Sequence, residues 1–129
     1  MKRLVTTSIA AAFLAVPAFA DPVLGLYKTE PGDEGNFAHV ELYECGAEIC
    51  GVIRQAFDAS GSPVESDTIG KRMIWDMAAK GEGSYSGGKI WAPDRDKVYK
   101  SKMQLSGGTL KVSGCVAVIC RSQSWMRLN

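Results

Sequence analysis

Apolar and polar residues alternate on both sides of Gly107-Gly108, and this pattern predicts an antiparallel sheet with one face in water. Two glycines between two alternating runs are typical of a tight β-hairpin turn. The residues predicted to face the core are Tyr99, Ser101, Met103, Leu105, Leu110 and Val112. Those predicted to face water are Lys100, Lys102, Gln104, Lys111 and Ser113.

Short apolar runs separated by turn residues predict eight strands along the chain. Pro, Gly, Asp and Ser fill the connections, for example at residues 31–35, 60–63 and 93–96. Val64–Lys80 is the segment that could hold a helix, but Gly70 weakens it, so we expect a loop there with room for one short helical turn. The predicted strands are Leu24–Thr29, Phe37–Cys45, Ile49–Phe57, Met73–Met77, Tyr85–Trp91, Val98–Leu105, Thr109–Cys115 and Cys120–Leu128.

Eight short antiparallel strands in so small a chain favour closure into an up-and-down barrel, because closure removes the exposed sheet edges. A transmembrane barrel is the rival all-β interpretation, and it would need an outward apolar band on every strand. Lys100, Lys102, Lys111 and Arg121 interrupt such a band. We therefore predict an all-β chain with a small eight-stranded barrel and no membrane insertion.

The first 20 residues have the pattern of a secretory signal peptide. Lys2 and Arg3 precede an apolar run, and Ala18-Phe19-Ala20 is typical of a cleavage site. We therefore predict a signal peptide over 1–20, a single barrel domain over 21–129, and a periplasmic or secreted location. Cleavage would lower the Lys and Arg count from 15 to 13 against 14 Asp and Glu, a net charge of −1. That charge argues against a nucleic-acid partner.

The four cysteines form two C-x4-C pairs, which in an exported chain indicate disulfides. Three connectivities are possible, and we favour Cys45–Cys50 and Cys115–Cys120, because each pair brackets a short connector between predicted strands. A zinc site built from all four thiolates is the alternative, although zinc fingers favour closer cysteine spacing. We predict two local disulfides, no metal and no cofactor.

Several segments together resemble one bacterial family. They include Gly25-Leu26-Tyr27, Asn36-Phe37-Ala38-His39-Val40-Glu41, Gly87-Gly88-Lys89-Ile90, and the closing stretch from Gly114-Cys115 to Trp125. The chain resembles the small exported proteins catalogued as domain of unknown function 2147. The resemblance implies a lipocalin-like (calycin-type) barrel and no particular reaction.

In lipocalins a G-x-W motif on the first strand packs against a late arginine and closes the barrel. Gly25-Leu26-Tyr27 is similar, with Tyr in place of Trp, and Arg121 or Arg127 would supply the cation that stacks on it.

Residues suited to catalysis are few. His39, the one histidine, shares a predicted strand face with Glu41, which would suit acid–base work or, with a third carboxylate, a metal. A barrel histidine bonded to a neighbour is the simpler interpretation. Ser86 lacks the context of a serine nucleophile, and Asp94 with Asp96 is more typical of a turn than of a calcium site. We therefore expect no enzyme, with acid–base chemistry at His39 as the exception.

Methionine and tryptophan are abundant for so small a chain, and such side chains adapt to irregular ligands. We predict a small apolar or amphipathic ligand at the mouth of the barrel, with the chain a monomer or weak dimer. The alternative is a protein-interaction module, such as an inhibitor of envelope hydrolases or a stress factor, acting through the loops 31–35 and 60–70. The candidate ligand-binding residues are Trp75, Trp91, Tyr99, Met103, Trp125, His39 and Arg121.

Overall fold

The computed structural model describes residues 21–129, so the predicted signal peptide lies outside the described residues. Within them every regular element is a β-strand, and no helix is long and apolar enough to cross a membrane. The strands are β1 (Gly25–Lys28), β2 (Phe37–Cys45), β3 (Glu48–Phe57), β4 (Pro63–Val64), β5 (Arg72–Gly81), β6 (Ser84–Ala92), β7 (Lys97–Ser106), β8 (Thr109–Val116) and β9 (Ile119–Arg127).

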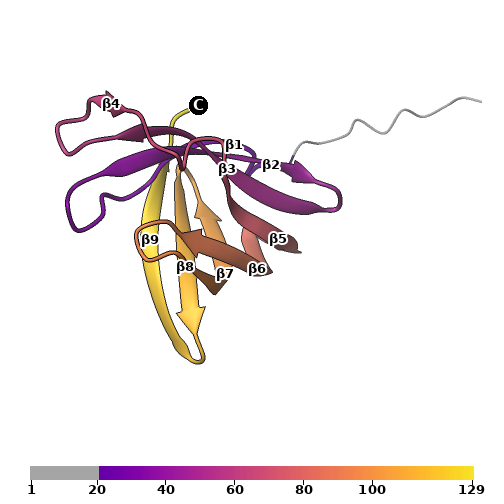
Figure 1. The fold of residues 1–129 in the computed structure, drawn as a ribbon. Coiled ribbons are helices and arrows are strands. Elements are labelled where there is room, and N and C mark those ends of the chain that lie inside the picture. Colours follow the sequence, from indigo (N-terminus) through magenta and orange to yellow (C-terminus); the bar gives the residue numbers. More distant parts are fainter. Residues whose placement is uncertain (1–20) are drawn as a thin grey trace, which may run out of the picture.

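Eight of these strands close into an antiparallel up-and-down barrel (Figure 1). Each pairs with the next along the chain, β9 returns to pair with β1, and β4 is a two-residue addition to the edge of β3. The predicted barrel and its eight strands are confirmed. Of residues 64–80, residues 65–71 form the expected loop, with a turn at 67–70, and residues 72–80 belong to β5. Ile74 and Met77 of β5 are both buried although they are three positions apart, and the strand is irregular between them, at Asp76, whose φ is +56°.

The β7–β8 hairpin has the predicted register, with Leu105 opposite Leu110 and Met103 opposite Val112. One prediction in this hairpin is wrong, because Ser113 is 3% exposed. Its side chain is on the outer face as expected, but it lies between the paired strands β7 and β9. Its hydroxyl is hydrogen-bonded to the hydroxyl of Ser122 at 2.6 Å. A small side chain on the middle strand of three can therefore be buried on the outer face without entering the core.

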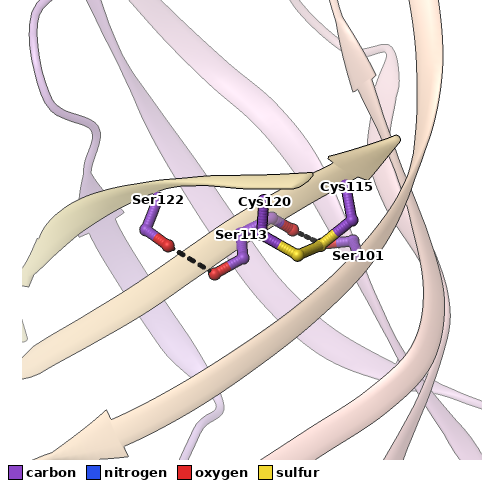
Figure 2. Close-up of a disulfide and its surroundings, with 5 residues drawn as sticks. All are labelled: Ser101, Ser113, Cys115, Cys120 and Ser122. Carbon is purple, nitrogen blue, oxygen red and sulfur yellow. Dashed lines mark hydrogen bonds between the residues drawn. A yellow bond between two sulfur atoms is a disulfide. The ribbon is translucent and has the colours of Figure 1, made fainter. Parts of the chain in front are cut away.

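Both local disulfides form as predicted, Cys45–Cys50 between β2 and β3 and Cys115–Cys120 between β8 and β9 (Figure 2). They lie at opposite ends of the barrel, since β2 and β8 run in opposite directions and each disulfide flanks the turn that follows its strand. Cys50 is 1% exposed and belongs to the core, whereas Cys120 is exposed.

Candidate functional site: the open mouth of the barrel

The two ends of the barrel are closed to different extents because their connections differ in length. One end carries the three short turns 46–47, 82–83 and 107–108, together with the N-terminal segment 21–24. The opposite end, called the mouth here, carries the long connections 29–36 and 58–71 and the turns 93–96 and 117–118. Long polar connections leave space at the mouth that short turns do not.

The short-turn end is sealed by a cluster around Tyr27, which is 0% exposed. Its hydroxyl donates to the carbonyl of Val23 at 2.9 Å and accepts a hydrogen bond from Arg127 Nη2 at 2.8 Å. The Arg127 guanidinium also lies over the Tyr27 ring, 5.1 Å from its centroid, and donates to the carbonyl of Leu24 at 3.0 Å. Burial raises the pKa of Tyr27. Of the two arginines considered for this contact, the structure places Arg127 here and Arg121 at the mouth.

The short-turn end has no space for a side chain at position 25, so this residue must be glycine. A Cβ at Gly25 would lie 2.8 Å from Asn129 Oδ1 and 3.0 Å from Arg127 Nη1, and its φ of +141° is one that side-chain-bearing residues rarely adopt. Tyr85 completes the seal through a hydrogen bond from its hydroxyl to the Asp21 carboxylate. The short-turn end is therefore packed and hydrogen-bonded, which leaves the mouth as the candidate site.

The mouth contains two adjoining hollows of about 630 and 670 Å³. Trp125 lies at the base of the first, where it is 1% exposed and its indole N–H donates to Gln123 Oε1 at 2.9 Å. The second hollow lies between β3 and the long connections and includes Ala38 and Ile53 on its wall. The two share wall residues, so they are parts of one opening. The shared residues are Glu30, Gly32, Asp33, Met73, Asp94, Arg95 and Gln123.

Four of the seven candidate residues line the first hollow, namely Trp91, Tyr99, Trp125 and Arg121. Tyr99 is half-buried and points inward with the core-facing residues of β7. Arg121 lies opposite Gly114 in the β8–β9 pair, where the glycine leaves room beside it. Among residues 21–129 neither the Tyr99 hydroxyl nor the Arg121 guanidinium has a hydrogen-bonding partner. The mouth therefore combines an apolar floor with polar groups that have no partner among the described residues.

Trp91 is fixed at the rim by two contacts. Its indole N–H donates to Asp96 Oδ1 at 2.9 Å, and the ammonium of Lys71 lies 5.7 Å from the centre of its ring. Asp96, considered above as half of a D-x-D motif, therefore serves to orient an aromatic side chain of the mouth. Within the described residues no group of three or more His, Cys, Asp or Glu side chains is arranged to hold a metal.

The other three candidates lie elsewhere because of strand alternation. Ile74 and Val40 are 0% exposed and point inward, so their neighbours Trp75 and His39 lie on the outer face. Trp75 packs there under the guanidinium of Arg72, 5.4 Å from its ring centre. Met103 does point inward, but it is 3% exposed and packs in the core rather than at the mouth.

His39 belongs to an aromatic cluster on the outer face rather than to a catalytic pair. Its ring centroid lies 4.4 Å from that of Phe57, which itself stacks on Phe37 at 4.9 Å. Glu41, its proposed partner, is bonded instead to Arg54 at 2.7 Å. Burial and the nearby Lys28 ammonium lower the pKa of His39, which favours the neutral ring.

Sequence reasoning missed Glu30 as a residue of the mouth. Its carboxylate accepts a hydrogen bond from the backbone N–H of Ser124, at 2.7 Å, across 94 positions of sequence. Strand β1 ends two residues before Glu30, so the backbone N–H of Ser124 in β9 has no strand partner and is hydrogen-bonded to the Glu30 side chain instead. No local pattern around residue 30 marks a contact of that range.

Comparisons with known proteins agree with this geometry. A solved structure, described as protein HP1028 from the human pathogen Helicobacter pylori and as belonging to the lipocalin family, matches with a TM-score of 0.71. The identity is 18%, and 85% of each chain is covered, so the likeness shows the lipocalin-like fold. The comparison with curated proteins gives no match. Residues 25–127 match the family model described as an uncharacterized protein conserved in bacteria (DUF2147), and the chain therefore belongs to the DUF2147 family.

Proposed function

We propose that the protein binds one small amphipathic molecule at the mouth of its barrel. The observation that carries the proposal is the joining of an apolar floor to unpartnered polar groups inside a hollow of about 630 Å³. Ligand sites in proteins have volumes of about 300–1,000 Å³ and combine apolar walls with a few polar groups that orient the ligand.

The apolar part of the ligand packs against Trp125 and the side chains beside it, Ile90 and Val112. Covering about 200 Å² of apolar surface would contribute about 5 kcal/mol at about 25 cal/mol per Å². Association entropy offsets part of that gain, so affinity also depends on the polar end.

The polar end is oriented by Arg121 and Tyr99. Arg121 of β9 is paired with Gly114 of β8, and Tyr99 of β7 lies diagonally beside the same glycine. Arg121 supplies donors in a fixed planar arrangement, and the Tyr99 hydroxyl supplies one more. A ligand end that accepts hydrogen bonds, such as a carboxylate or hydroxyl, matches these groups. A quaternary ammonium end does not.

We also propose that the protein works in the periplasm or outside the cell. Disulfides such as Cys45–Cys50 and Cys115–Cys120 persist in oxidising compartments. The predicted signal peptide over residues 1–20 leads to the same location.

The three tryptophans permit a positional test by fluorescence, because Trp125 is on the floor and Trp75 on the outer face. One variant, W75F/W91F, retains Trp125 alone, and a second, W91F/W125F, retains Trp75 alone. Each is titrated with dodecanoate and with dodecyltrimethylammonium below their micelle concentrations, after thermal unfolding confirms that both variants fold. We expect dodecanoate to shift Trp125 emission saturably and to leave Trp75 emission unchanged.

The polar contact is tested with Arg121→Ala, for which Lys111→Ala on the exposed outer face is the matched control. Losing a charge-assisted hydrogen bond worth about 1.5–3 kcal/mol should weaken dodecanoate binding by about tenfold or more. The control should bind as the original protein does. Equal responses from Trp125 and Trp75, or no saturable response from Trp125 with either amphiphile, would refute the proposed site.

A further inference from the structure

Strand β9 has a barrel partner on one side for only part of its length. It pairs with β8 from Val116↔Ile119 to Thr109↔Met126, but its pairing with β1 consists of Tyr27↔Arg127 and Lys28↔Met126. Residues 119–125 therefore have no strand partner on this side, where the Ser124 N–H is bonded to the Glu30 side chain, and Figure 1 shows the β8–β9 tip extending beyond the rest of the barrel. We call residues 119–125 the β9 edge.

The outward backbone groups of this edge follow from the hydrogen bonds at its closed end. The Leu128 N–H donates to the carbonyl of Leu26, and the Ser124 N–H donates to Glu30, so even-numbered residues direct their N–H toward β1. Antiparallel pairing alternates along a strand, so the N–H and C=O groups of Cys120 and Ser122 point the same way. No backbone partner for them exists among residues 21–129.

The β9 edge also lacks the features that commonly prevent strands from pairing with other chains. Residues 119–125 contain no proline and no lysine, and their single charge is Arg121. The Cys115–Cys120 disulfide and the Ser113–Ser122 hydroxyl pair hold the strand in extended form from its outer face (Figure 2). A strand that is already extended loses little conformational entropy when it gains a partner.

Exposed apolar side chains flank this edge at the hairpin tip. Val116, Val118 and Ile119 are 62%, 95% and 70% exposed, the most exposed apolar group of the described chain. Contiguous apolar exposure of this kind is typical of a contact surface.

We propose that the β9 edge binds an extended segment of a partner protein by antiparallel strand addition. Main-chain hydrogen bonds to Cys120 and Ser122 would supply the register. Arg121 then lies opposite a partner residue in a non-hydrogen-bonded pair, where side chains approach most closely. The segment recognised has an acidic residue at that position and an apolar residue two positions later, opposite Ile119.

A second copy of this chain fits the edge less well. Self-pairing that matches Cys120 with Ser122 places Arg121 directly opposite its own copy, and like charges in that position are destabilising. Self-pairing centred on Ser122 matches Cys120 with Ser124, whose N–H is already bonded to Glu30. A different chain carrying a carboxylate meets neither difficulty.

The test is selection of random linear peptides on the full protein, followed by titration of the enriched peptides. We expect enriched sequences with an acidic residue followed two positions later by a β-branched or aromatic residue. Ser122→Pro removes one edge N–H and should weaken binding by about tenfold or more, the effect of about 1.4 kcal/mol. Ser122→Ala is the matched control, because it loses the hydroxyl contact with Ser113 but keeps the N–H.

A charge reversal provides a second measurement that does not depend on proline being tolerated. Arg121→Glu should shift the enriched sequences from acidic to basic residues at the same position. The proposal is overturned if no peptide is enriched over a protein-free selection, or if Ser122→Pro folds and binds the peptides unchanged. Dodecanoate binding to the Ser122→Pro variant, measured separately, distinguishes failure of this site from failure of the ligand site.

Discussion

Both ends of the barrel contain an arginine and a tyrosine, but the two pairs differ in their hydrogen bonds. At the short-turn end, Arg127 and Tyr27 are held together by hydrogen bonds and ring stacking. At the mouth, Arg121 and Tyr99 also come from β9 and a nearby strand, but neither has a partner among residues 21–129. The same pair of residue types therefore stabilises the fold at the closed end and has no such contact at the open end.

The largest difference in stability between the two ends is expected when their disulfides are removed. Each joins cysteines five positions apart, so chain entropy gives each about 2 kcal/mol. Cys50 is also buried in the core, so C45A/C50A should cost about 3 kcal/mol and C115A/C120A about 2 kcal/mol. Urea unfolding of the two double variants measures both values. A larger loss at the mouth would break the comparison.

Alanine substitutions of Arg127 and Arg121 should give a smaller difference in the free energy of unfolding. Arg127→Ala removes hydrogen bonds to Tyr27 and Leu24 and should lower the free energy of unfolding by about 2 kcal/mol. Arg121→Ala removes an exposed side chain without a partner and should change it by less than about 0.5 kcal/mol. Thermal unfolding of the two variants in parallel decides the point, and equal losses would count against a distinct role for each end.

Alkaline pH should lower the free energy of unfolding through the two buried tyrosines of the short-turn end. Burial raises the pKa of Tyr27 and of Tyr85, so the folded chain keeps protons that the unfolded chain releases near pH 10. The stabilisation is present below about pH 10 and is lost as pH rises through the folded values. Tyr85→Phe should flatten the fall in unfolding free energy above about pH 10. An unchanged slope in that variant would exclude Tyr85 as a source.

The fold was largely predictable because its determinants are local. Alternation around Gly107-Gly108 defined a hairpin and its inward residues, and the C-x4-C spacing favoured the correct cysteine pairs. Ser113 was the exception in this hairpin, since burial on an outer face depends on contacts with neighbouring strands, here the hydroxyl of Ser122. Those neighbours are distant in sequence.

The candidate site was predictable only in part, because residue type does not report where along a strand a side chain lies. Trp75 and Trp91 look alike in the sequence, yet one lies on the outer face and the other at the rim. Glu30 reaches the site only because β1 ends early and leaves the Ser124 N–H without a strand partner. That contact follows from barrel closure, which no window of sequence contains.

Native mass spectrometry of the protein purified gently from cells tests the central claim, that the mouth holds a ligand. The comparison is with Gly114→Leu, because Gly114 lines the mouth, and even a Cβ there would lie 3.5 Å from Tyr99 Cβ and Ile90 Cγ2. We predict a discrete mass increment over the denatured mass in the original protein and none in the folded variant. Absence of an increment in the original protein, or its persistence in Gly114→Leu, would contradict the account.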